Sequence, residues 1–370
     1  MTSFEYYVVR LWQVIALAHG KVSYLLRIMP LVFRRKGNTL SKSYRADLDG
    51  LRAIAILCVV VFHAYPQLLP AGLMGVDLFF VLSGYLITSL LQRQSLGSIK
   101  DIGLFYARRL QRLYPPLLLF LLVMLLLAGL SPASDIYSGL WRYALSAGAF
   151  GMNVHLAIDY GLLGDRYTYN PFLHLWSLGI EGQFYVLWPW VFWFGLHIKH
   201  WKVALFLLLC GSLFSVGMLY GMGADRWLFY APSSRLFEMI FGAALACHGK
   251  TLSPQYDRYS LVLILVFMCL AVLWIRPDQP YPNLATALPV MAATLFIYNS
   301  PQHPLNQWLA AKPLVYIGRM SYSWYLWHWG LFALYQSWLS MWLLILISFM
   351  LGSLSYQWLE LPLQRWRKGA

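Results

Sequence analysis

The sequence predicts an all-α, polytopic membrane protein. Of its 370 residues, 60% are hydrophobic and only 11% are charged, whereas soluble domains contain roughly 45–50% apolar and ~25% charged residues. The mean hydropathy of +0.58 points to the same class. The apolar runs are too long and too uninterrupted to be the strands of a membrane β-barrel, so we expect helices.

Residues 1–43 form a basic N-terminal extension that is only partly apolar. Basic residues interrupt its apolar stretches, and a basic cluster follows at 34–36. It lacks the charge order and the small-residue end of a cleavable signal peptide. We therefore expect an interfacial amphipathic helix here, followed by a single membrane domain over residues 44–370.

Eleven apolar segments follow the extension. They cover about residues 51–66, 75–92, 114–131, 138–156, 176–198, 203–222, 232–248, 258–275, 283–300, 314–336 and 339–358. Cytoplasmic loops carry an excess of lysine and arginine, and this excess orients a membrane protein. The stretch 93–112, the residues just after 198 and the end of the chain are all basic, so we expect them in the cytoplasm.

These three placements agree only if one segment does not cross the membrane. The weakest is 138–156, which is short, carries Arg142 and is rich in glycine and alanine. We expect it to be re-entrant, which is tolerated where protein covers the irregular backbone. About ten transmembrane helices then remain, with both termini cytoplasmic and the loops 157–173, 223–231 and 276–282 outside.

Ionisable side chains within the first two apolar segments form the first candidate site. Such groups cost roughly 2.5–3.5 kcal/mol each at a helix centre on insertion scales, so they favour a functional role. Arg52 and His63 are eleven residues apart and share one helix face. His63 suits a general base, with a structural imidazole as the alternative. Arg52 is either functional or a headgroup anchor, and Asp77 either caps its helix or orients His63.

Two arginines before the third segment form a second candidate site. Arg109 and Arg112 lie at i and i+3 on one helix face. This spacing suits binding of a polyphosphate, although ordinary cytoplasmic charge explains it as well.

A third candidate site lies at the outer mouth of the fifth segment, in the motif HLWSLGIEGQ. Here His174 and Glu181 are seven residues apart, hence on one helix face, with Trp176 between them. Aromatic rings beside polar groups suit a carbohydrate, but an interfacial aromatic belt or an ion pair of Glu181 explains them too. His328, in WYLWHWG, is a second intramembrane imidazole for substrate binding or proton transfer.

Other patterns indicate structural roles, or argue against a metal site and nucleic-acid binding. Arg235 and Glu238 at i, i+3 predict an ion pair, and the pair Ser83–Gly84 predicts close helix packing. The four cysteines have no ligand spacing, so we expect no metal. The net charge of +14 fits membrane orientation and lipid headgroups better than nucleic acid.

Five motifs in order resemble the acyltransferase-3 family of integral-membrane O-acyltransferases. They are R-x10-H on the first segment, GVDLFFVLSGYLIT, RRLQRLYP, HLWSLGIEGQFYVLWP and GRMSYSWYLWHW. The resemblance covers about residues 45–360 and suggests a stand-alone form without a soluble esterase-like domain. The chain departs at Gly182, where many relatives read EEQF, and at Leu361, where they often carry a basic residue.

The resemblance implies transfer of an acyl group, usually acetyl, from cytoplasmic acyl-CoA to a hydroxyl across the bacterial inner membrane. The acceptor would be a surface or lipid-linked glycan, such as lipopolysaccharide O-antigen or exopolysaccharide. The family's motif residues fall on Arg52, His63, Asp77, Arg109, Arg112 and Glu181.

We therefore expect the arginines to hold the phosphates of acetyl-CoA and His63, oriented by Asp77, to deprotonate an acceptor that enters past His174 and Glu181. An acyl-His63 intermediate is a variant. The alternative is a transporter of a small solute or lipid-linked glycan, which also suits buried charges and a broken segment, although we see no inverted repeat. The acceptor sugar, the acyl length and the oligomeric state stay open.

Overall fold

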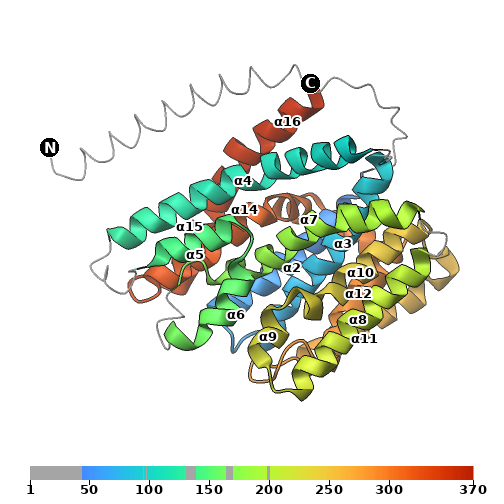
Figure 1. Cartoon of the computed structure of the whole chain (residues 1–370), viewed down its shortest axis with the longest axis horizontal. Helices are drawn as coiled ribbons and strands as arrows, with labels where there is room; N and C mark the ends of the chain where they lie inside the picture. The colour runs from blue at the N-terminus through green and yellow to red at the C-terminus, as the bar shows by residue number, and fades with distance from the viewer. Residues whose placement is uncertain are drawn as a thin grey trace. The chain divides into compact units, whose positions relative to one another are not determined.

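The fold is described from a computed structural model, which describes residues 44–94, 96, 98–130, 139–163, 170–197 and 201–369. In these residues the secondary structure is helical without any strand, as predicted (Figure 1). Residues Arg45–Glu360 form one compact unit, and the helix α16 (Leu361–Gly369) belongs to a second. The extension predicted for residues 1–43 lies outside the described residues, so its interfacial helix stays a prediction.

Ten helices of the described residues each overlap one predicted apolar segment, although the helix Ile99–Gly129 begins well before the segment predicted from residue 114. They are α2 (Ala46–Ala64), α3 (Met74–Gln94), α4 (Ile99–Gly129), α7 (Trp176–His197), α8 (Trp201–Gly221), α10 (Pro232–His248), α11 (Asp257–Trp274), α12 (Ala287–Tyr298), α14 (Lys312–Tyr335) and α15 (Met341–Ser355). Short helices connect them: η2 (Pro70–Leu73), η5 (Leu173–Leu175), α9 (Asp225–Tyr230), η6 (Pro254–Tyr256), η7 (Leu284–Thr286), α13 (Pro304–Leu309) and η8 (Tyr356–Glu360).

Within the described residues, five helical segments are long and apolar enough to cross a membrane. They are Pro70–Gln94, Ile99–Gly129, Trp201–Gly221, Pro254–Trp274 and Met341–Arg365. Most side chains of α8 are not covered by protein, and apolar residues occur on all sides of the helix. A helix that faces lipid is expected to have this pattern. The predicted total of about ten crossings and the cytoplasmic side of both termini stay predictions.

Glycines set how closely the central helices pack. A Cβ on Gly84 of α3 would lie 1.9 Å from the Met239 carbonyl oxygen of α10, and one on Gly242 would lie 1.9 Å from the Val81 carbonyl oxygen. On α14, a Cβ on Gly318 would lie 1.7 Å from the Asp49 carbonyl oxygen. Small residues allow this close approach of membrane helices. The packing predicted for the Ser83–Gly84 pair is confirmed for its glycine.

The segment predicted to be re-entrant is a broken helix. It forms α5 (Leu140–Gly148) and α6 (Met152–Leu163), with Phe150 at a positive φ of 54° between them. The Gln183 side chain of α7 donates a hydrogen bond to the Phe150 carbonyl at 2.9 Å and another to Asn153 at 2.8 Å. The first bond satisfies a backbone carbonyl at the break, and the second joins Gln183 to a side chain of α6. Pairing of such backbone groups is the condition for irregular backbone inside a membrane. Its depth in the membrane stays a prediction.

The departure at Gly182 has a structural reason in this break. A Cβ at Gly182 would lie 2.4 Å from the ring of Phe150 and 2.7 Å from its Cβ. A side chain there must therefore displace Phe150, and overpacking of this kind costs about 1–3 kcal/mol. We expect Gly182→Ala to lower the thermal unfolding midpoint of the detergent-purified protein by several degrees.

The matched control is Gly211→Ala on α8, where an added Cβ meets nothing within 4 Å. In open space, alanine stabilises a helix relative to glycine by roughly 0.5–1 kcal/mol, so this control should unfold at an equal or higher temperature. An equal rise for both variants would show that Phe150 does not exclude a side chain at Gly182.

Candidate active site

The histidines of α2 and α14 contact each other. His63 Nδ1 lies 2.9 Å from His328 Nε2, and the two rings are stacked with centroids 5.1 Å apart. His328 Nδ1 lies 2.7 Å from the carbonyl oxygen of Tyr325. A carbonyl only accepts hydrogen bonds, so His328 Nδ1 carries a proton and His328 Nε2 is the acceptor in the neutral ring. His63 Nδ1 must then donate, which leaves a free lone pair on His63 Nε2.

His63 is also the accessible member of this pair. It is the second-last residue of α2 and is partly exposed, whereas His328 is fully buried. The Trp329 ring borders it, with centroids 4.8 Å apart. The arrangement therefore presents one basic nitrogen, His63 Nε2. The hydrogen bond to the buried His328 fixes the tautomer of the His63 ring. This is what a general base requires.

His174 lies beside the same pair. Its ring centroid is 5.3 Å from that of His328 and 5.1 Å from that of Tyr325. Its ring is buried, and neither nitrogen has a hydrogen-bond partner among the described residues. The structure thus brings together three predicted site histidines, from α2, η5 and α14.

A second feature, which we call the arginine pocket, is a cavity of about 100 Å³ between α2, α3, α4, α7 and α14. Its polar lining consists of Arg52, Ser83, Arg109, Arg112, Ser177, Glu181, Tyr185, Ser321, Tyr322 and Tyr325. The three predicted arginines therefore share one pocket, whereas Arg108 is exposed. Three guanidinium groups around one cavity suit a polyphosphate, because each offers several donors in a planar fork.

Glu181 lies in the arginine pocket and not with His174. The Ser83 hydroxyl donates a hydrogen bond to Glu181, and Tyr185 lies 3.2 Å from the same hydroxyl. The prediction of a shared helix face with His174 was wrong, because α7 begins only at Trp176 and His174 belongs to the preceding turn η5. Helical spacing does not extend across that boundary.

Tyr325 connects the arginine pocket to the histidines. Its hydroxyl lies 2.7 Å from the Ser177 hydroxyl and donates to the His174 carbonyl at 2.6 Å. Its own carbonyl accepts the hydrogen bond of His328. Since Tyr325 lines the pocket and precedes His328 by three residues, the pocket and the histidine pair lie about one helical turn apart along α14.

Asp77 takes part in a different cluster. Its Oδ1 lies 3.3 Å from Arg235 Nη1, and the Tyr281 hydroxyl donates to its Oδ2. Arg235 Nη1 also lies 3.3 Å from Glu238 Oε1, which confirms the predicted ion pair. All three charged side chains are fully buried. We call this group the buried ion cluster.

The expected contact between Asp77 and His63 does not occur in this arrangement, where His328 is the partner of His63. The packing of α2 against α3 explains why. A Cβ on Gly75 would lie 2.4 Å from the Ala55 carbonyl oxygen, so Asp77 is level with that part of α2. His63 is eight residues further along, a rise of about 12 Å.

Trp176 is likewise a packing residue in this structure. It is 6% exposed, its ring lies 4.6 Å from that of Phe229, and the Arg235 guanidinium lies 5.4 Å from its centroid. Its ring is thus packed against protein, and the sugar contact expected from its position beside His174 stays a prediction. For an aromatic residue near a predicted interface, the sequence does not distinguish packing within the protein from sugar binding.

Two buried or partly buried polar groups, one of them in the arginine pocket, were not singled out from the sequence as functional. Ser83 was interpreted only as a packing residue, although its hydroxyl binds Glu181. Glu360 is 1% exposed and accepts a hydrogen bond from Ser323 at 2.5 Å. A lone acid at the end of the last apolar segment was the available signal for Glu360, since burial of such a group is costly.

Comparisons with known proteins identify the family of the chain. A family model described as an acyltransferase domain matches residues 45–358. The O-acetyltransferase OatA of Staphylococcus aureus (strain NCTC 8325 / PS 47) is 31% identical over 362 residues, covering 90% of this chain and 59% of the relative. OatA of strain MRSA252 has the same identity and coverage.

The chain therefore spans about three-fifths of the length of these curated relatives. No solved structure matches it. The family model nevertheless covers most of the chain, including both histidines of the pair and the whole arginine pocket. The chain belongs to the acyltransferase-3 family.

Proposed function

We propose that this protein transfers an acyl group, with acetyl expected, from acyl-CoA to a hydroxyl of a surface or lipid-linked glycan at the bacterial inner membrane. The observation that carries the proposal is the hydrogen bond between His63 and His328, about one helical turn from the arginine pocket. The relatives are named as O-acetyltransferases, which supports the choice of acetyl.

The arginine pocket is the proposed site for the phosphates of the donor. Arg109 and Arg112 project from one face of α4, and Arg52 completes the pocket from α2. Glu181 and Ser83 line the same pocket, so a carboxyl group lies among the guanidinium groups before the donor arrives. Because cytoplasmic loops carry an excess of lysine and arginine, we expect this end of α4 on the cytoplasmic side. Acyl-CoA is found on that side.

His63 is the proposed general base. Its Nε2 takes the proton of the acceptor hydroxyl as that oxygen attacks the thioester carbonyl, and a C–O bond forms while the C–S bond breaks. The imidazolium then returns the proton to the leaving CoA thiolate, so the products are the glycan ester and free CoA. His328 accepts a hydrogen bond from His63 Nδ1–H throughout, which stabilises the imidazolium as it forms.

The experiment that tests this function compares surface glycans from cells with and without the protein by mass spectrometry. We expect a fraction of one glycan to carry an added acetyl mass only when the protein is present. Purified protein in liposomes should also release free CoA from acetyl-CoA when a glycan acceptor is supplied. A solute transporter would give neither result.

The arginine pocket gives a direct prediction about the donor. We expect Arg109→Gln and Arg112→Gln each to raise the KM for acetyl-CoA about tenfold or more, because a hydrogen bond to a charged group contributes about 1.5–3 kcal/mol. Initial rates of CoA release in liposomes measure this.

Arg108→Gln is the matched control, since Arg108 neighbours Arg109 but is exposed and does not line the pocket. Its KM should equal that of the wild type. An equal increase in all three variants would mean that general positive charge, and not this pocket, attracts the donor.

A further inference from the structure

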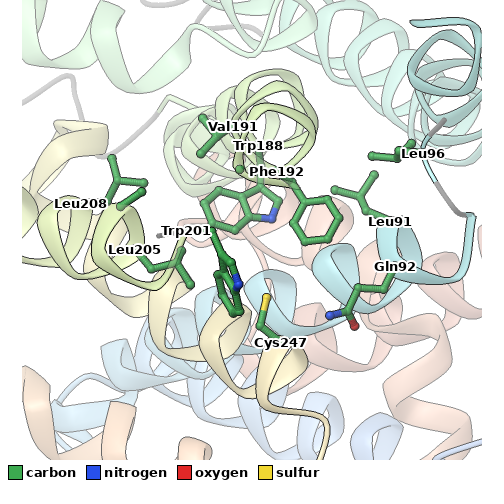
Figure 2. A pocket seen from close by; sticks show the side chains of 12 residues that line it. Leu91, Gln92, Leu96, Trp188, Val191, Phe192, Trp201, Leu205, Leu208 and Cys247 are labelled. Atoms are coloured by element: carbon green, nitrogen blue, oxygen red, sulfur yellow. The ribbon is translucent and has the colours of Figure 1, made fainter. Parts of the chain in front are cut away.

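A second and larger cavity is lined mainly by residues of α3, α7, α8 and α10. Its volume is about 540 Å³, and we call it the apolar pocket (Figure 2). Apart from Gln92 and Cys247, its lining side chains are aliphatic or aromatic, with Trp188, Phe192 and Trp201 surrounding its centre. This volume is within the roughly 300–1,000 Å³ typical of ligand pockets.

The apolar pocket is separate from the arginine pocket. Trp188 Nε1 donates a hydrogen bond to Thr88 Oγ1 at 2.8 Å, which ties α7 to α3 between the two cavities. Both residues are buried. The bond also satisfies the polar atom of Trp188, so its ring presents an apolar wall. The proposed donor site therefore does not explain this second cavity.

The apolar pocket reaches the lipid-facing surface of the protein. Val191 lines it and is 40% exposed, and the neighbouring α8 residues Phe206 and Leu207 are each 62% exposed. In a membrane protein these surfaces are covered by hydrocarbon. An occupant can thus enter sideways from the bilayer without crossing water.

Three basic residues lie close in sequence to residues that line the pocket, near the ends of α3, α8 and α10. Arg93 follows the lining residue Gln92, and Lys202 follows Trp201, with its ammonium 6.0 Å from the Trp201 ring. Lys250 comes three residues after Cys247, just past the end of α10. All three basic side chains are exposed. Basic residues beside a cavity between membrane helices attract anionic lipid headgroups.

We infer that the apolar pocket binds one acyl chain of an anionic glycerophospholipid, whose phosphate lies near Lys202, Arg93 and Lys250. The apolar wall accounts for the chain, the lipid-facing side accounts for entry, and the three basic residues account for selection of an anionic headgroup. This site is independent of the proposed acyl transfer. A bound lipid would fill the seam between α7 and α8 on the side away from the arginine pocket.

Native mass spectrometry of the detergent-purified full chain tests the site, with dioleoyl phosphatidylglycerol and dioleoyl phosphatidylcholine as probes. Gly195→Trp fills the pocket, because Gly195 lines it and an added Cβ there meets nothing within 4 Å. We expect this variant to lose the tightest bound phosphatidylglycerol. Gly217→Trp on α8 is the matched control, also open to an added Cβ but outside the pocket, and should bind like the wild type.

A second variant tests the headgroup without altering the packing. Lys202 is exposed, so Lys202→Gln should fold normally and lower the preference for phosphatidylglycerol over phosphatidylcholine about fivefold, the effect of one basic residue near the phosphate. Equal lipid binding by the Gly195→Trp and Gly217→Trp variants would overturn the site. An unchanged lipid preference in Lys202→Gln would overturn the assignment of the headgroup.

Discussion

We expect His63→Ala to lower the rate of acyl transfer about 100- to 10,000-fold, the range that general acid–base catalysis contributes. The reason is that His63 Nε2 is the basic nitrogen left by the hydrogen bond to His328 and is carried by the more accessible ring of the pair. The rate should fall while the KM for acetyl-CoA changes little, because His63 does not line the arginine pocket. Single-turnover assays in liposomes separate these two quantities.

The control for this prediction is His248→Ala, at the exposed C-terminal end of α10. It removes an imidazole without touching either the histidine pair or the arginine pocket, and its rate should match that of the wild type. Full acyl transfer by folded, membrane-inserted His63→Ala protein would remove His63 from the mechanism.

By the same reasoning we propose that His328 is a positioning residue. It contacts His63 and is fully buried, and its Nε2 is the hydrogen-bond acceptor in this pair. His328→Gln retains an acceptor at this place, whereas His328→Leu does not. We therefore expect the glutamine variant to keep more activity than the leucine variant at equal thermal stability. A purely structural role would instead make activity follow stability in both variants.

The positions of many helices could be predicted because their central parts are long apolar runs bounded by polar residues. The predicted segment 232–248 coincides with α10, for example, and 258–275 differs from α11 by one residue at each end. The ion pair Arg235–Glu238 was equally predictable, since it depends only on helical spacing. Local rules suffice for features within one helix.

Partners on different helices could not be predicted in this way. Asp77 meets Arg235 and not His63 because close glycine contacts set the height of α3 against α2 and α10. His63 meets His328 because α14, which is distant in sequence, packs along α2. Periodicity states which face a residue occupies, but not which neighbour that face meets or at what height.

The buried ion cluster leads to the prediction with the largest expected effect on stability. Arg235→Met should lower the free energy of unfolding by about 3–5 kcal/mol, because it leaves the carboxylates of Asp77 and Glu238 buried without their counter-charge. It also removes the cation–π contact with Tyr281, whose ring centroid is 4.8 Å from the guanidinium. Denaturant unfolding of the detergent-purified protein measures the loss.

Neutralising the carboxylates distinguishes charge from packing as the cause. The triple variant Arg235→Met, Asp77→Asn, Glu238→Gln keeps the side-chain volumes but has no uncompensated charge, so it should regain a large part of the lost stability. If the triple variant is no more stable than Arg235→Met, the loss comes from packing. Asp77→Asn alone also separates the ion-cluster role of Asp77 seen in the structure from the role of orienting His63 expected from the sequence. As a member of the ion cluster it should lose stability more than specific activity, whereas an orienting partner of His63 would lose activity as His63→Ala does.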